Sequence, residues 1–303
     1  MNNPIPAPNP GKIVVGLGEV LWDLLPAGKQ LGGAPCNFAY HAHSLGADAR
    51  VITRVGADPL GEEILQRFQD AALSTELISI DPTFPTGTVS VELSGDGQPR
   101  FTIHEQVAWD HLQATAAARE VMSHCDAVCF GSLCQRSDPA RVAIQSLVSA
   151  TPTQALRVFD INLRQHFFSR EVIETSLELA NLLKINEQEL PVLAEMFCLS
   201  GNLTFQIHRL SDRFGLTLVA LTRGAHGSLL ISRGHCSEHP GFPVKVMDSV
   251  GAGDAFTAAL VSGLLGGGSL DEINRRANAL ASYVCSQPGA TPRLPEELRR
   301  KIQ

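Results

Sequence analysis

Short apolar runs alternate with longer stretches of helical periodicity along most of this chain. The helical stretches include Pro35–Leu45, which ends at Gly46, and Pro59–Ala72. A glycine at that position favours a left-handed residue that closes a helix. Runs of strand length occur at Lys12–Gly18, Arg50–Val55, Asp126–Phe130, Leu156–Asp160, Asn181–Ile185 and Thr217–Leu221. Apolar strands separated by helices predict an α/β fold of three layers, with a mostly parallel central sheet covered on both faces.

Three segments depart from this alternation. Residues Thr86–His104 alternate with period two around Gly95-Asp96-Gly97, which predicts a hairpin. Leu24–Gln30 is a short polar excursion after the first strand, and Gly227–Val246 predicts short antiparallel strands followed by two helices. We expect segments near 24–31 and 86–110 to form a small β-layer apart from the main sheet. A hairpin that extends the sheet edge fits the pattern equally well.

Composition and charge narrow the classes of function. The 303 residues are 44% hydrophobic and 18% charged, and the net charge of −7 argues against a protein that coats nucleic acid. No apolar run approaches the roughly 18 residues that span a bilayer, so no membrane partner is expected. Residues 1–10 are rich in Pro and Asn and predict a disordered leader rather than a secretion signal. We therefore expect a cytoplasmic protein.

The cysteines favour the same compartment. There are seven, with no C-x-x-C pair, which indicates reduced thiols. A metal site at His124, Cys125 and Cys129 is an alternative, but Cys in an apolar strand is usually a small core residue.

The motif Asp248-Ser249-Val250-Gly251-Ala252-Gly253-Asp254 precedes a strongly apolar helix. Small residues at 251–253 let the backbone approach a ligand and direct N–H groups outward at a helix N-terminus, an arrangement that binds phosphate oxygens. A carboxylate beside such a site can accept a proton from a hydroxyl that attacks a bound phosphoryl group. Alternatively, Asp254 only complements the helix dipole.

Two further motifs place polar groups where ligands bind in α/β sheets. Gly32-Gly33 precedes Pro35, so Asn37 falls on the opening turn of a helix, although a tight structural turn is the alternative. Asp160 and Asn162 follow a buried strand and project to one side, and Arg164 adds a donor suited to phosphate.

Three motifs are compatible with nucleotide and metal binding. Asn186 and Glu189 form either a helix capping pair or a site that organises hydrated Mg²⁺. The segment Thr222–Gly227 closes a buried strand with a glycine-rich turn that suits a nucleotide. Asn278 and Ser282 share one helix face, which lines either a purine pocket or solvent.

Two known nucleotide motifs are missing. The chain has no G-x-x-x-x-G-K-[ST], which excludes a P-loop kinase. Gly16-Leu17-Gly18 follows the first strand, but Leu21 stands where a dinucleotide fingerprint has its third glycine. A Rossmann-type oxidoreductase is therefore a distant alternative.

Together these motifs resemble the ribokinase-like carbohydrate kinases, also called the phosphofructokinase B family. The similarity runs in order from about Lys12 to the C-terminus, so residues 11–303 are expected to form one kinase domain. Gly32-Gly33 and Asn37 resemble the first family signature, and Asp248–Asp254 resembles the second, D-T-x-G-A-G-D, with Ser249 in the Thr place.

The resemblance implies a role for each matching residue. Asp254 would be the catalytic base beside an anion hole of Gly251, Ala252 and Gly253. The implied substrate-binding residues are Asp23, Gly32, Gly33, Asn37 and Arg164. The implied nucleotide-binding residues are Asn186, Thr222, Gly224, Gly227 and Asn278. Glu189 would serve Mg²⁺, while Asp248 and the Val250 carbonyl would bind a monovalent cation such as K⁺.

Within the family, Gly18–Asp23 and Leu31–Pro35 look most like fructokinases. The implied reaction is transfer of the γ-phosphoryl group of Mg-ATP to a sugar hydroxyl, with fructose expected as the sugar. Ribose, a nucleoside or a keto-deoxy sugar acid are alternative acceptors, and a non-catalytic ligand sensor is an alternative of another class. We also expect a homodimer formed through the small β-layer.

Overall fold

A nine-stranded sheet forms the centre of the computed structural model, which describes residues 11–25, 28–93 and 99–302. Neighbouring strands are parallel except for the β11–β12 and β12–β13 pairs. From one edge to the other the order is β13 (His235–His239), β12 (Ser228–Ser232), β11 (Leu218–Thr222), β10 (Leu182–Asn186), β9 (Leu156–Asp160), β8 (Ala127–Phe130), β1 (Ile13–Leu17), β4 (Asp48–Gly56) and β5 (Ile78–Asp81). The mostly parallel sheet predicted from the apolar runs is confirmed.

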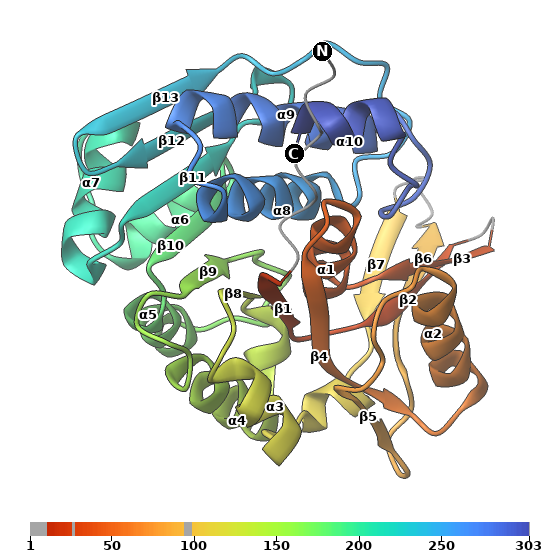
Figure 1. Ribbon diagram of the computed structural model, residues 1–303. Coiled ribbons are helices and arrows are strands. Elements are labelled where there is room, and N and C mark those ends of the chain that lie inside the picture. The colour runs from red at the N-terminus through yellow and green to blue at the C-terminus, as the bar shows by residue number, and fades with distance from the viewer. Residues whose placement is uncertain (1–10, 26–27, 94–98, 303) are drawn as a thin grey trace.

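Helices cover both faces of this sheet, as Figure 1 shows. Side chains alternate between the two faces, so that Val14 packs in one core and Val15 in the other. One core contains α1 (Ala34–Ser44), α2 (Pro59–Asp70), α8 (Ala252–Leu265), α9 (Leu270–Cys285) and the end of α10 (Glu296–Ile302). The other contains α3 (Ala116–Met122), α4 (Asp138–Ser149), α5 (Arg170–Leu179), α6 (Glu189–Met196) and α7 (Leu203–Phe214).

A separate four-stranded sheet, here named the lid sheet, stands beside the central one (Figure 1, right). Its order is β3 (Gly28–Gly32), β2 (Leu21–Leu25), β6 (Gly87–Leu93) and β7 (Pro99–Ile103). The predicted hairpin is β6–β7, although its expected tip at 95–97 lies outside the described residues. The polar excursion at 24–30 contributes to two paired strands, β2 and β3, which belong to this layer as expected. Because β5 ends the central sheet, this layer does not extend that edge.

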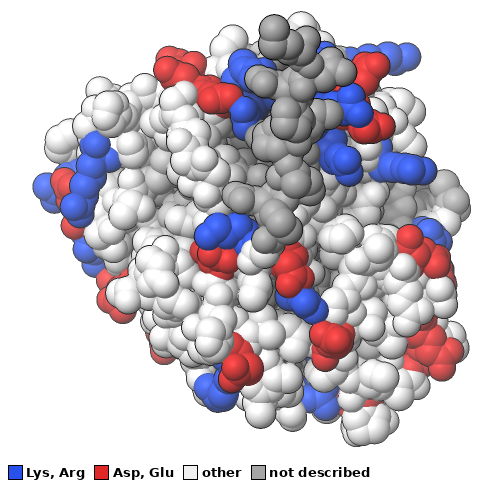
Figure 2. All heavy atoms as spheres, in the orientation of Figure 1, with Lys and Arg blue, Asp and Glu red and all other residues white. Residues whose placement is uncertain are grey.

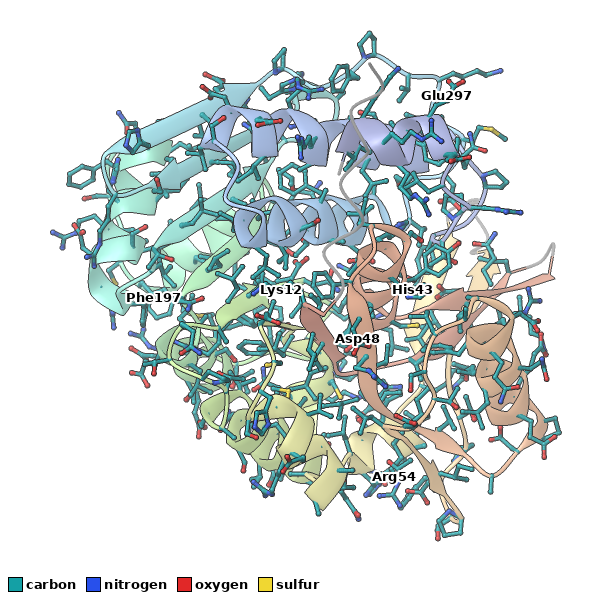
Figure 3. The ribbon with its side chains drawn as sticks, in the orientation of Figure 1. Lys12, His43, Asp48, Arg54, Phe197 and Glu297 are labelled. Carbon is teal, nitrogen blue, oxygen red and sulfur yellow. The ribbon has the colours of Figure 1, made fainter. Side chains whose placement is uncertain are left out.

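The carboxyl end of β1 is the point where the order of the central sheet reverses. β1 lies between β8 and β4, and ligands in open α/β sheets bind at such a switch point. Helix α1 packs closely here, because a Cβ at Gly16 would lie 2.1 Å from the Pro35 carbonyl oxygen. Lys12 and Asp48 mark the opposite, amino ends of β1 and β4 (Figure 3). A ligand-binding site is therefore expected where β1, β9 and β10 end.

The surface carries no broad region of one charge on the face shown in Figure 2, where acidic and basic side chains are interspersed among uncharged ones. In the described part of the chain, no helix is long and apolar enough to cross a membrane.

Candidate active site

The first turn of α8 forms a backbone site for an anion. It begins after Gly251, whose φ of 78° is left-handed and whose Cβ would lie 2.4 Å from the Ala290 carbonyl oxygen. Both observations require glycine at this position. Within the described residues, the N–H groups of Gly253 and Asp254 have no hydrogen-bond acceptor. Free donors at a helix N-terminus attract phosphate oxygens, as the sequence motif predicts.

Asp254 lies on this turn and contacts the N-terminal part of the chain. Its Oδ2 accepts a hydrogen bond from Asn37 Nδ2 at 2.8 Å, so two distant motifs meet. Burial raises the pKa of Asp254 to about 6, and the nearby carboxylate of Asp160 adds to the rise. The Asn37 hydrogen bond and the cations of Lys184 and Arg164 act in the opposite direction. At neutral pH the carboxylate is therefore ionised and available to accept a proton.

The predicted sugar-binding residues gather around the start of α1. Gly32 packs against Asp23, because a Cβ there would lie 2.6 Å from Asp23 Oδ2. Gly33 caps α1 with a φ of 111° and approaches the Glu19 carbonyl oxygen, which a Cβ would meet at 2.5 Å. Burial raises the pKa of Asp23 to about 6, while the positive charge of Arg164 partly opposes this. Arg164 itself is exposed and also acts on Asp254.

Glu19 belongs to this cluster, although the sequence analysis assigned it no role. Its side chain is buried, and its Oε2 has no hydrogen-bond partner among the described residues. Burial raises the pKa of Glu19 to about 7, and the negative charge of Asp254 contributes to the rise. A carboxylic acid directly after a buried strand was the available sequence sign, since Glu is rarely fully buried without a partner.

Asn186 and Glu189 form a reciprocal capping pair at the start of α6. Asn186 Oδ1 accepts the backbone N–H of Glu189 at 3.0 Å, and Glu189 Oε2 accepts that of Asn186 at 2.8 Å. Glu189 Oε1 accepts the Leu163 N–H at 3.0 Å, which ties α6 to the loop after β9. The capping alternative is thus realised. Each carboxylate oxygen keeps a second lone pair, so contact with the water shell of a metal ion is still available.

Asp248 stabilises the loop that leads into α8 through two hydrogen bonds. Its Oδ1 accepts the Val250 N–H at 3.0 Å, and its Oδ2 accepts the Gly289 N–H at 3.1 Å. The carboxylate therefore joins the start of α8 to the segment after α9. In the described residues, no group of three His, Cys, Asp or Glu side chains is arranged to hold a metal ion.

Three of the five predicted nucleotide residues lie at or after the end of β11, while Asn186 ends β10 and Asn278 lies on α9. Thr222 ends β11, and the turn after it contains Gly224 and Gly227, both with positive φ. A Cβ at Gly227 would lie 2.0 Å from the His239 carbonyl oxygen, so this turn packs tightly against β13. Asn278 is instead buried, and its Nδ2 contacts Ser228 Oγ at 2.7 Å. Its nucleotide role therefore stays a prediction.

An ion pair beneath the site was also missed. Lys184 Nζ lies 3.0 Å from Asp160 Oδ1, and both side chains are nearly fully buried. Lys184 sits in the otherwise apolar run Leu182–Ile185, which the sequence analysis treated only as a strand. A charged residue inside such a run was the sign that could have identified it.

Comparison with known proteins is consistent with this geometry. The model of the pfkB family carbohydrate kinases matches residues 27–297. A fructokinase of Klebsiella pneumoniae is 31% identical, with 96% of this chain and 99% of that protein covered. The Vibrio cholerae fructokinase solved with fructose, ADP and calcium has a TM-score of 0.79 and 25% identity, covering 96% and 99% of the two chains. A Pyrococcus horikoshii sugar kinase solved with ATP has a TM-score of 0.80 and 27% identity, covering 96% and 100%.

The raised pKa of Glu19 predicts a pH dependence of stability. Between its ordinary value of 4.5 and about 7, the folded chain holds a proton that the unfolded chain has lost, so stability falls as pH rises. Glu19→Gln keeps the shape and removes this titration. Between pH 5 and pH 8, the free energy of unfolding of the wild type should fall by roughly 2–3 kcal/mol more than that of the variant.

Urea unfolding at the two pH values measures this difference. Asp23 and Asp254 titrate in the same direction and are retained in both proteins, so the difference between the two slopes reports Glu19 together with its coupling to Asp254. Equal pH slopes in the two proteins would show that Glu19 is ionised in the folded state.

Proposed function

Because this chain belongs to the pfkB family of carbohydrate kinases and is a phosphotransferase with an alcohol acceptor, we propose that it transfers the γ-phosphoryl group of Mg-ATP to a hydroxyl of fructose. The observation that supports this most directly is the hydrogen bond between Asn37 and Asp254 beside the free N–H groups of the α8 turn. It brings a candidate base, a polar group of the sugar-binding segment and an anion site to one place.

In this proposal Asp254 accepts the proton of the attacking hydroxyl. Its carboxylate is ionised at neutral pH, and Asn37 holds one of its oxygens. The hydroxyl proton leaves late in a loose phosphoryl-transfer transition state, so orientation of the base matters more than a high pKa. The N–H groups of Gly253 and Asp254 stabilise the charge that develops on the transferring group.

Nucleotide and metal ions have candidate sites on the same edge of the sheet. The Gly224–Gly227 turn after β11 and the neighbouring Asn186 would receive the nucleotide. Mg²⁺ neutralises phosphate charge when it is bound with ATP. Glu189 is suited to contact the ion indirectly, through its bound water, because each of its oxygens already accepts a backbone N–H. Asp248 and the Val250 carbonyl are the candidates for a monovalent cation.

Fructose is favoured by the relatives and by the hydroxyl-binding groups near the start of α1. The similar Klebsiella and Vibrio proteins are named fructokinases, and the latter was solved with fructose. Asp23 and Asn37 suit hydroxyl groups, since a carboxylate and an amide accept and donate hydrogen bonds to them. Arg164 is the one cation among these residues, so a sugar acid is the alternative that it leaves open.

The lid sheet is proposed to cover the sugar and to pair two chains. Phe101 lies on it, is 52% exposed and points to the same face as Asp23, because the register aligns Asp23, Val89 and Ile103, and Phe101 is two residues from Ile103. A second copy of the same sheet is the occupant that would bury this side chain symmetrically.

A screen of about twenty sugars and nucleosides, read by ADP release, tests the acceptor. Fructose should give the highest kcat/KM. The comparison with gluconate-type acids matters most, because Arg164 would favour them. A preference for ribose, a nucleoside or a sugar acid would refute fructose and retain the kinase reaction.

Asp254→Asn tests the base. The amide has the same shape but accepts no proton, so kcat should fall about 10²–10⁴-fold while KM changes little. If Asp254 only complements the helix dipole, stability should fall by about 0.3–1 kcal/mol and turnover should stay near normal. Measuring kcat and thermal unfolding on one variant distinguishes the two roles.

Light scattering at micromolar concentration tests the pairing of chains. We expect the mass of a dimer, and Phe101→Lys should shift it to that of a monomer through charge repulsion. A wild-type monomer would contradict the proposal.

A further inference from the structure

The ion pair between Lys184 and Asp160 joins two neighbouring strands below the α8 turn. The ammonium and carboxylate groups are 3.0 Å apart, with exposures of only 8% and 5%. Burying two charges costs desolvation energy that their attraction often only offsets, so a buried pair is weak evidence for a stabilising role. Well-packed apolar residues would serve these two strands equally well.

The pair also contacts the helix that bears Asp254. The Thr257 hydroxyl, one turn further along α8, lies 3.2 Å from Asp160 Oδ2 and 2.9 Å from the Gly253 carbonyl oxygen. A Cβ at Gly253 would lie 3.0 Å from Lys184 Nζ. The Lys184 ammonium group therefore lies next to the first turn of α8, and the Asp160 carboxylate contacts the same helix through the Thr257 hydroxyl.

Several charged or titratable groups act on Asp254 or are acted on by it. On one side Asp160 raises the pKa of Asp254, and on the other Lys184 and Arg164 lower it. Burial works to lower the pKa of Lys184, but Asp160, Glu189 and Asp254 together raise it above its usual value.

The remaining groups around the Asp254 carboxylate are Asn37 and Cys36 on α1, Cys129 on β8, and Glu19 after β1. The thiols of Cys36 and Cys129 have raised pKa values through burial and are neutral.

We propose that the Lys184–Asp160 pair is a positioning device, which fixes the α8 turn and in which Lys184 offsets part of the repulsion that Asp160 exerts on the Asp254 carboxylate. The two members act on Asp254 with opposite sign, since Asp160 repels its negative charge and Lys184 attracts it. Asp160 has the larger effect of the two. This inference rests on the proposed role of Asp254 as the base.

The opposite signs allow a test that a merely structural pair would fail. The variants are Lys184→Met, Asp160→Asn and the double substitution. The control is Lys12→Met, which removes a partly exposed ion pair, 2.7 Å long with Asp126, at the amino end of the sheet (Figure 3). For each protein, kcat/KM for the preferred sugar is measured from pH 5 to pH 8 with ATP. Titration of ATP itself is common to all of them.

The acidic limb of the pH profile of kcat/KM should move to higher pH in Lys184→Met and to lower pH in Asp160→Asn. A shift of about one pH unit changes the activity at pH 6 relative to pH 8 by up to about tenfold. The limb of the double variant should lie between those of the two single variants, at slightly lower pH than in the wild type because Asp160 has the larger effect, and Lys12→Met should not move the limb. If Lys184→Met does not fold, the double variant is compared with Asp160→Asn. Its acidic limb should lie at higher pH, which measures the effect of Lys184 in the same way.

Shifts in one direction only, or unchanged limbs with lower thermal stability, would overturn the proposal and leave the pair a structural element. Asp254→Asn separates this failure from that of the proposed function. If Asp254→Asn retains turnover, Asp254 is not the base and the inference loses its premise. If turnover is lost but the limbs of the pair variants stay fixed, only the inference fails.

Discussion

The hydrogen bond between Asn37 and Asp254 joins the first and last thirds of the chain, 217 residues apart. Its 2.8 Å length is possible only because α1 and α8 both begin against the carboxyl ends of the central strands. On the α1 side, Gly16 allows Pro35 to approach β1 closely. On the α8 side, Gly251 allows the same approach to Ala290. Two close helix contacts made by glycine thus determine where the candidate base and its partner meet.

The charges around this bond follow from the same geometry. Strands that end at one edge bring several carboxyl groups into a space with little water, where burial raises the pKa of each and the charge of neighbouring carboxylates adds to the rise. Glu19, Asp23 and Asp254 all have raised pKa values for this reason. Arg164 at the surface and Lys184 in the interior oppose the rise. The site is therefore a balance of buried charges rather than a simple acidic cluster.

The lid sheet shows where pattern and structure differ. Period-two alternation indicated the β6–β7 hairpin, because one face of a sheet packs inward. The same pattern left open whether the hairpin extends the main sheet, since alternation does not identify the neighbouring strand. The pairing of β2 with both β3 and β6 makes it a separate sheet. The β2–β6 pairs join residues more than sixty positions apart, so the sequence assigned the segments near 24–31 and 86–110 to one layer without identifying which strands pair.

By itself, the sequence determined the fold class, the parallel sheet, the helices closed by glycine and the motif at Gly251–Asp254. Each depends on local periodicity or on a residue type with restricted backbone geometry. Only the tertiary structure decided that Asn37 contacts Asp254, that the Glu189 carboxylate accepts the N–H groups of Asn186 and Leu163, and that Lys184 and Asp160 pair beneath the site. These contacts depend on which strands lie side by side, and a buried Lys in an apolar run reveals its partner only once β9 and β10 are adjacent. The packing of distant segments, not any local pattern, sets those neighbours and the charges that they share.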